Sequence, residues 1–218
     1  MSFAVTSRPR RRLEHPCHAA FLMPALVVID IQNDFCSGGT LAVAGAEAIL
    51  PVVNQLIEDH EHVVLTQDWH PPGHVSFASS HPPARPFDRI VTARGEQTLW
   101  PDHCLAGTRG AEFHPDLAAG DSPAVVRKGT RREADAYSGF FECDGRTPVG
   151  LDAILRRLGV REITLAGLAT DVCVLHTALD ARRLGYGVRL VTAACRGTSC
   201  PGSRDALRRM AAAGVNCE

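Results

Sequence analysis

Short apolar runs alternate along this chain with segments in which apolar residues recur at helical spacing. The apolar runs have the length of strands and occupy residues 25–30, 62–68, 124–129, 162–169 and 188–194. Helical spacing is found at residues 47–60, 151–159, 170–185 and 203–214. Strands that are apolar on both faces and joined by helices are typical of a parallel sheet covered on both sides. The pattern predicts a three-layer α/β/α fold with a mainly parallel sheet of about six strands, the last being VNCE at 215–218.

Two segments do not follow this alternation. Residues 1–22 contain four arginines between positions 8 and 12 and no sustained periodicity, which predicts a disordered basic tail ahead of a single domain at 23–218. Residues 71–123 are rich in Pro, His and Gly. An irregular stretch of this length is too long for a simple connection, so we expect it to build part of a site.

Composition narrows the classes of partner. The chain has 218 residues, of which 45% are hydrophobic, and a formal net charge of −1, so no global charge excess favours nucleic acid or an anionic membrane. No apolar run approaches the ~20 residues that span a bilayer, and the N-terminus lacks the apolar centre of a secretory signal. We therefore expect a cytoplasmic protein with a small-molecule partner, and a homo-oligomer is left open. The eight cysteines include no CxxC pair, which favours reduced thiols.

Four of the predicted strands end in side chains that carry chemistry. Asp30, Asp68 and Lys128 lie at the ends of the first three strands, and the fourth leads into Cys173. In an open parallel sheet, ligands bind beyond the carboxyl ends of the strands. Each residue alone has a structural explanation, such as a buried carboxylate or a surface cation. Their joint placement predicts one shared site.

Cys173 is the candidate nucleophile because it falls near the start of the predicted helix 170–185. With Thr170 as the N-cap, Cys173 would occupy the third helical position, where free N–H groups and the helix dipole favour a thiolate. We therefore expect the pKa of Cys173 to be lowered. The same N–H groups are placed to hold the oxyanion of a tetrahedral intermediate.

A thiol that attacks a carbonyl also needs a base to receive its proton. Asp30 is the first candidate because it ends an apolar strand, and Lys128 would hold it ionised or pair with the thiolate. His176 is the alternative base, since a spacing of three residues places it on the helix face of Cys173.

The stretch TQDWHPPGH (66–74) predicts a metal site. Asp68 and His70 are two residues apart, so on a strand they would share one face, and a carboxylate with an imidazole suits a divalent cation. The pair alone is equally consistent with an ordinary hydrogen bond. A third ligand is needed, and the residues leave His74 and His103 as alternatives.

Six segments carry a resemblance to a known family. They are VVIDIQNDFCSGGTLAV (27–43), TQDWHPPGHVSF (66–77), WPDHCLAGTRGAEFHP (100–115), RKG (127–129), AYSGF (136–140) and GLATDVCV (167–174). Together they resemble the nicotinamidase/pyrazinamidase branch of the isochorismatase-like cysteine hydrolases. The first and last segments are typical of the whole superfamily, whereas DWHPPGH with WPDHC is much more specific to the nicotinamidases.

The resemblance implies catalytic roles for named residues. Asp30, Lys128 and Cys173 match the catalytic triad, with Cys173 as nucleophile and Asp30 as proton shuttle. The backbone amides of Ala169 and Cys173 match the oxyanion hole, beside a non-proline cis peptide expected near Leu168 and Ala169.

The resemblance also implies the ligands of one divalent metal ion and the residues of a substrate pocket. Asp68, His70 and His103 match the metal ligands of the family, which commonly binds zinc, with iron or manganese as alternatives. His74 aligns with a position that ligates in some members and not in others. The implied substrate-binding positions are Phe35, Trp100, Tyr137 and Leu168.

The implied activity is that of a nicotinamidase, a metal-dependent amidohydrolase. It would convert nicotinamide to nicotinate and ammonia, and pyrazinamide to pyrazinoate, through a cysteine thioester. Another amidase of the superfamily, acting on carbamoyl or ureido substrates, is the nearest alternative because it needs the triad but no metal. A non-catalytic α/β binding module with a structural metal is the alternative from a different class. A true isochorismatase does not fit, because the matching position in that branch is not cysteine.

Overall fold

A parallel sheet of six strands, in the order β5-β2-β1-β6-β7-β8, forms the middle layer of the molecule. The computed structural model describes residues 24–92, 94–120 and 124–218, so the expected basic tail at 1–22 lies outside the described residues. The strands are β1 (Ala25–Ile29), β2 (Val63–Asp68), β5 (Ala124–Lys128), β6 (Glu162–Leu168), β7 (Gly187–Arg196) and β8 (Asn216–Cys217). The prediction of a parallel sheet with a short last strand is confirmed.

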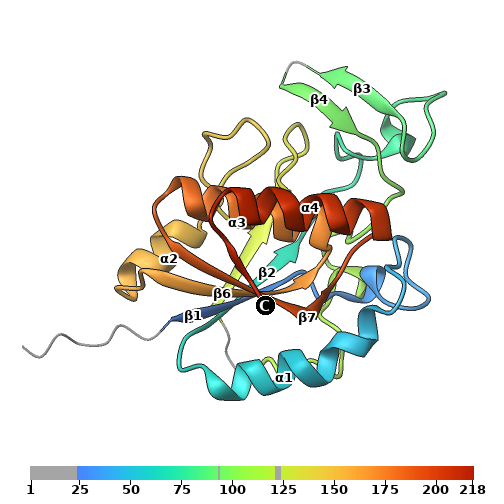
Figure 1. Ribbon diagram of the computed structural model, residues 1–218. Helices are drawn as coiled ribbons and strands as arrows, with labels where there is room; N and C mark the ends of the chain where they lie inside the picture. The colour runs from blue at the N-terminus through green and yellow to red at the C-terminus, as the bar shows by residue number, and fades with distance from the viewer. Residues whose placement is uncertain (1–23, 93, 121–123) are drawn as a thin grey trace, which may run out of the picture.

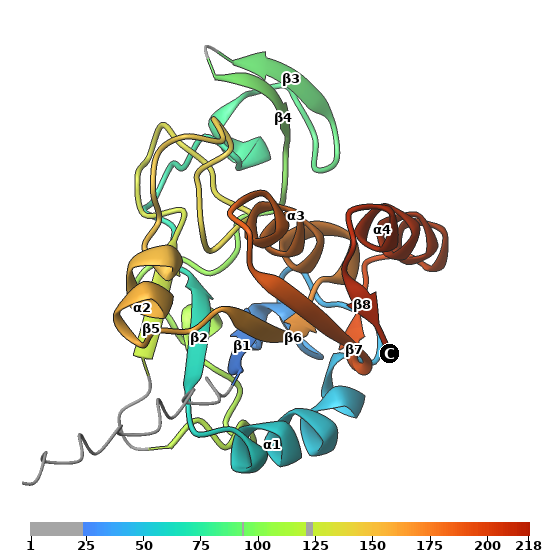
Figure 2. The same cartoon turned by 60° about the vertical axis from the view of Figure 1, so that its left-hand side comes forward.

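Helices cover both faces of this sheet and complete three layers (Figure 1). One face is covered by α1, and the other by α2, α3 and α4; a view turned by 60° shows the same division (Figure 2). Their bounds are α1 (Leu50–Asp59), α2 (Leu151–Arg157), α3 (Leu175–Arg183) and α4 (Cys200–Ala212). Among the described residues, no helix combines the length and the apolar character needed to cross a membrane.

The sheet separates two apolar cores, and the central strand β1 supplies both. Ala25, Val27 and Ile29 pack into the core shared with α2, α3 and α4, whereas Leu26 and Val28 pack into the core shared with α1. All five are at most 1% exposed. Successive side chains of a strand point to opposite faces, so a strand buried on both sides is apolar at every position.

The long irregular segment contains a hairpin that the sequence pattern did not predict. Strands β3 (Arg89–Thr92) and β4 (Gly95–Thr98) pair antiparallel and project beyond the helical layer (Figures 1 and 2). Both strands are short and largely exposed, so they lack the apolar face that marks a strand in sequence. The 3₁₀ turns are η1 (Asn33–Phe35), η2 (Ala46–Ile49), η3 (Ala78–Ser80) and η4 (Arg109–Ala111).

The strand order brings the chemistry-bearing strand ends together. Strands β5, β2, β1 and β6 are consecutive neighbours in the sheet. Asp68 at the end of β2 is the pairing partner of Lys128 at the end of β5. Asp30 directly follows β1, which lies between β2 and β6. The carboxyl edge of the sheet therefore carries the candidate site, as expected for an open parallel sheet.

Candidate functional site

A buried ammonium group lies between two carboxylates at this edge. The Nζ atom of Lys128 is 2.9 Å from Oδ2 of Asp30 and 2.5 Å from Oδ1 of Asp68. Lys128 and Asp30 are at most 1% exposed and Asp68 is 4% exposed. Lys128 is therefore an internal counter-ion, and its alternative explanation as a surface cation is wrong.

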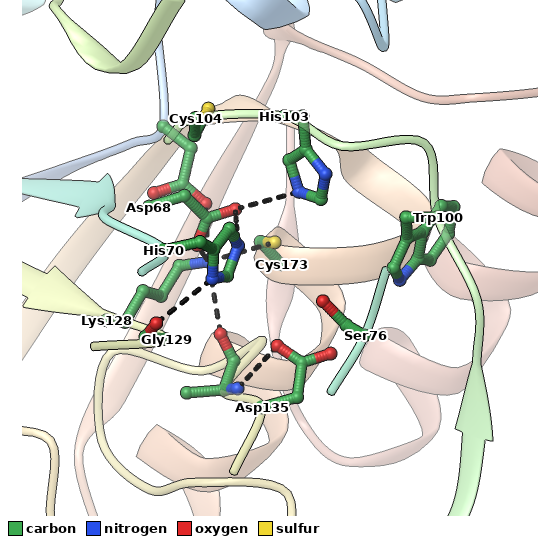
Figure 3. Close-up of polar contacts among 12 residues, drawn as sticks. Asp68, His70, Ser76, Trp100, His103, Cys104, Lys128, Gly129, Asp135 and Cys173 are labelled. Carbon is green, nitrogen blue, oxygen red and sulfur yellow. Dashed lines mark hydrogen bonds and ion pairs between the residues drawn. The ribbon is translucent and has the colours of Figure 1, made fainter. Parts of the chain in front are cut away.

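Cys173 belongs to the same cluster. Its Sγ atom lies 3.3 Å from Nζ of Lys128, and Figure 3 shows Lys128 reaching between Asp68 and Cys173. Ligand atoms of Asp30, Asp68 and Cys173 all lie within 4.8 Å of one another. The structure thus brings these four side chains together at the carboxyl edge of the sheet.

The local structure before Cys173 differs from the prediction. Residues Thr170–Val174 form a turn of π-helix, η5, that leads into α3, and Ala169 is the cap residue in place of Thr170. No side chain caps this turn. Cys173 is therefore the fourth residue of the helical segment, within the first turn, where N–H groups lack partners from the helix itself.

The expected lowering of the Cys173 pKa is wrong for this structure. Burial raises the pKa of the Cys173 thiol well above its ordinary value, and the opposing effect of Lys128 is smaller. The cavity removes the water that would stabilise a thiolate, and desolvation here outweighs the nearby cation. The thiol consequently keeps its proton until a base takes it.

Asp30 has the features of that base. Burial raises its pKa, although Lys128 acts in the opposite direction, so the carboxylate accepts a proton more readily than an exposed aspartate. Its Oδ1 atom accepts a hydrogen bond of 2.7 Å from the hydroxyl of Thr66. Among the described residues, no donor is aligned for a hydrogen bond to Oδ2, although the Lys128 ammonium is close to it. Oδ2 is thus the atom available to the thiol proton.

Lys128 and Asp68 stay charged in the same surroundings. Burial alone would lower the pKa of Lys128, but Asp30 and Asp68 outweigh it and the pKa lies well above its usual range. Burial alone would raise the pKa of Asp68, but Lys128 and His70 outweigh it and the pKa lies well below its usual range. The cluster therefore keeps one fixed cation and one fixed anion beside the titrating carboxyl of Asp30.

Asp68, His70 and His103 have the arrangement of a metal-binding set. The Nε2 atoms of His70 and His103 lie 3.7 Å and 3.8 Å from Oδ2 of Asp68 (Figure 3). Their Nδ1 atoms contact the backbone carbonyls of Gly129 at 3.0 Å and Pro101 at 2.8 Å. A carbonyl on Nδ1 requires the proton there and leaves Nε2 as the free ligand atom. The residues present therefore fit one divalent cation.

His74 is adjacent to this set but has no free nitrogen. Its Nδ1 atom contacts the Ser76 hydroxyl at 2.7 Å, and its Nε2 atom contacts the Ala134 carbonyl at 3.1 Å. The ring stacks on His70 with centroids 4.3 Å apart, and burial, with His70, lowers the pKa of His74 to about 4. Of the two alternatives for the third ligand, the geometry therefore favours His103. His74 instead packs against the ring of His70.

Two supporting residues escaped the sequence analysis. Gln32 donates hydrogen bonds to the carbonyls of Asp68 (2.8 Å) and Ala111 (2.9 Å), and its side-chain oxygen accepts the N–H of Asp68 at 2.7 Å. Asp135 is buried and accepts a 2.8 Å hydrogen bond from Gln97. Gln32 could have been suspected from its place two residues after Asp30, whereas nothing in the spacing marks Asp135.

Cys173 and the metal-binding set face one cavity, whereas Asp30 and Lys128 lie behind its wall. The cavity is lined by Phe35, Leu41, Val43, Asp68, His70, Trp100, His103, Asp135, Tyr137, Ala169, Val172, Cys173 and Thr198. The indole N–H of Trp100 donates to the Tyr137 hydroxyl over 3.1 Å. Trp100, Tyr137 and Phe35 are thus placed on the cavity as expected. A pocket with apolar walls and a few convergent polar groups is typical of a small-molecule site.

Two expected residues do not line this cavity. The Leu168 side chain is fully buried in the core shared with α1, and Ala169 lines the cavity in its place. The peptide bond between them is cis, as expected. His176, the alternative base, packs its ring on Tyr137 with centroids 5.2 Å apart and is absent from the lining. Asp30 therefore remains the better candidate for the base.

Comparison with known proteins gives a consistent result. Residues 24–217 match the isochorismatase domain. A nicotinamidase from Acinetobacter baylyi is 45% identical over 192 residues, covering 88% of this chain and 90% of that protein. A solved nicotinamidase/pyrazinamidase structure from Acinetobacter baumannii is 46% identical with a TM-score of 0.87, covering 90% of this chain and 95% of the other. A Pyrococcus horikoshii pyrazinamidase in complex with zinc is 34% identical with a TM-score of 0.76, covering 90% and 98%.

Proposed function

The chain belongs to the isochorismatase family, and we propose that it hydrolyses nicotinamide to nicotinate and ammonia, with pyrazinamide as a second substrate. One observation carries this proposal: the thiol of Cys173 and the set Asp68, His70 and His103 face the same small cavity. An amidase without a metal would need only the thiol and its base. The similarity to proteins named nicotinamidase and pyrazinamidase supports the same substrate class.

The first half of the reaction forms a thioester. The Sγ atom of Cys173 attacks the carboxamide carbon while its proton passes to Oδ2 of Asp30, whose raised pKa favours acceptance. The carbonyl oxygen gains negative charge, and we assign its stabilisation to the backbone N–H groups of two residues that line the cavity, Ala169 and Cys173. One such donor is worth about 3 kcal/mol of transition-state stabilisation. Asp30 returns the proton to the nitrogen, and ammonia leaves.

The second half of the reaction releases the acid. A water molecule gives a proton to Asp30 and attacks the thioester carbon, and the tetrahedral intermediate uses the same two N–H groups. Collapse of this intermediate breaks the carbon–sulfur bond, and the proton on Asp30 restores the Cys173 thiol. Lys128 contacts both Asp30 and Cys173, so its positive charge stabilises the negative charge on either group as the proton moves between them.

We propose that Asp68, His70 and His103 hold one divalent ion, with zinc as the first candidate because of the carboxylate and imidazole ligands. When bound, this ion supplies a positively charged partner for the ring nitrogen of the substrate. Trp100, Tyr137 and Phe35 would border the ring from the cavity wall. Fixing the ring orients the carboxamide toward Cys173, and orientation is worth several kcal/mol in well-positioned reactions.

An ammonia-release assay on nicotinamide tests the proposal. We expect Cys173→Ala to abolish turnover, and Cys200→Ala, at an exposed cysteine outside the cavity, to retain it. His103→Ala or treatment with a chelator should mainly raise KM. Full activity in Cys173→Ala would exclude the thioester, and indifference to both His103→Ala and chelator would exclude the ion. Faster turnover of a ureido substrate than of nicotinamide would favour the other amidase class.

A further inference from the structure

We infer that the chain holds a second metal site, formed by Cys36, Glu47 and His114, for a borderline divalent cation such as zinc. One ligand atom from each of the three side chains lies within 4.8 Å of the other two. The residues come from separate segments: Cys36 follows η1, Glu47 is part of η2, and His114 follows η4. This inference does not depend on the proposed reaction, because none of the three lines the catalytic cavity.

Backbone contacts hold these side chains in place. The N–H of Ser37 donates to Oε1 of Glu47 over 2.5 Å, and the N–H of Asp116 donates to Nδ1 of His114 over 3.2 Å. With Nδ1 engaged, Nε2 of His114 is the nitrogen available to an ion. The N–H of Cys36 is bonded to the carbonyl of Asn33 at 3.1 Å. The ligand atoms thus converge without a large rearrangement of the loop.

The donor set indicates the class of ion. Burial and the charge of Glu47 raise the pKa of the Cys36 thiol to about 11, so Cys36 becomes a thiolate only when an ion displaces its proton. The thiolate, the carboxylate and the imidazole then carry two negative charges, which match a divalent cation. Sulfur as a ligand favours zinc and similar ions over magnesium or calcium. A surface hollow beside the set is lined by Cys36, Gly38 and His114, so an ion could enter and water could complete its coordination. The catalytic set differs because its three ligands include no sulfur.

The second site adjoins a wall of the catalytic cavity. Phe35 and Val43 line that cavity, and the N–H of Val43 donates to the carbonyl of Phe35 over 3.0 Å. Cys36 follows Phe35 directly but belongs to the other hollow. An ion that joins Cys36, Glu47 and His114 would therefore fix the loop that carries this wall.

Cobalt titration of the full-length protein tests the site. The Cys173→Ala background removes the catalytic sulfur, so any thiolate-to-cobalt charge-transfer absorption must come from another cysteine. We expect the background protein to bind two cobalt ions per chain and to show this absorption. Adding Cys36→Ser should leave one ion and remove the absorption, whereas Cys200→Ser, at an exposed cysteine outside the set, should change neither.

Further variants separate the two sites and guard against misfolding. His103→Ala should lose one cobalt ion and keep the thiolate absorption. Glu47→Gln and His114→Gln change partly exposed side chains and should each lose the second ion with circular dichroism unchanged. Binding of a single ion without thiolate absorption by the background protein would overturn the inference. Retention of two ions in folded Glu47→Gln and His114→Gln would overturn it as well.

Discussion

The ammonium of Lys128 lies 3.3 Å from the sulfur of Cys173, and both residues are buried. The same ammonium forms ion pairs with Asp30 and Asp68. One lysine therefore joins the nucleophile, the base and the first metal ligand. Its removal should affect chemistry and folding together.

We expect Lys128→Met to reduce kcat/KM for nicotinamide by about 10²–10⁴-fold, the usual effect of disabling acid–base catalysis. It should also lower the free energy of unfolding by about 3–5 kcal/mol, because two buried carboxylates lose their counter-ion. Steady-state kinetics and urea unfolding measure these effects. Arg156→Met is the control, since its ion pair with Asp152 lies at the surface and contributes little to stability. A Lys128→Met enzyme that resembles the control would contradict the assigned role.

Gln32→Leu should weaken metal binding without touching a ligand. The side chain holds the backbone of Asp68 through its N–H and its carbonyl, and such supporting contacts typically change metal affinity about 10–100-fold. Equilibrium dialysis with zinc measures the change. Gln55→Leu is the matched control, because Gln55 is exposed and its side chain is hydrogen-bonded only to Asp59 among the described residues. Equal zinc affinity in the two variants would exclude a positioning role for Gln32.

Gly129→Ala should displace the His70 ring. A Cβ atom at Gly129 would overlap the ring atoms Cε1 and Nδ1 of His70. The control is Gly107→Ala, which has a similar left-handed backbone and nothing within 4 Å of the new atom. Both variants carry the ~1 kcal/mol strain of an L-residue in this conformation, so the difference between them reports the clash. We expect only Gly129→Ala to lose zinc affinity, and loss of equal size in both would remove His70 as the cause.

Asp144 gives a pH-dependent contribution to stability. Hydrogen bonds from Thr147 and Arg146 lower the pKa of Asp144 from 3.8 to about 2. Because the folded-state pKa is depressed, the stabilisation is complete above the unfolded pKa near 4 and is lost as the pH falls through about 2. Asp144→Ala should therefore lower the urea midpoint at pH 7 and have a much smaller effect near pH 2. A constant difference at both pH values would mean that ionisation of Asp144 is not the cause.

The strands and their chemistry could be predicted because burial on both faces leaves a clear mark in sequence. The apolar run before Asp30 and the run before Asp68 have this mark, and the parallel arrangement follows from the helices between them. The neighbouring ends of parallel strands then place Asp30, Asp68 and Lys128 together. The strands of the hairpin β3–β4 are largely exposed and have no such pattern, so the sequence did not predict them.

The chemical state of the site was harder to predict than its location. A helix start suggested a lowered pKa for Cys173, but the pKa depends on how deeply the sulfur is buried, which spacing does not reveal. The choice between His74 and His103 likewise required knowing which nitrogen is free. Gln32 and Asp135 form hydrogen bonds with residues that are distant in sequence, and no local sequence pattern indicates such contacts.

The position of Lys128 also limits how this site can change. Lys128 forms ion pairs with both the proposed base Asp30 and the proposed metal ligand Asp68. A change to the metal ligands therefore also changes the surroundings of the base. Exchanging Asp68 for a neutral ligand, to suit a different metal, would leave Lys128 with Asp30 as its main anionic neighbour and tighten that pair. A closer ion pair stabilises the ionised form of Asp30, so it lowers the pKa of Asp30 and makes this carboxylate a weaker base. Redesign of the metal preference would therefore require simultaneous redesign of proton transfer.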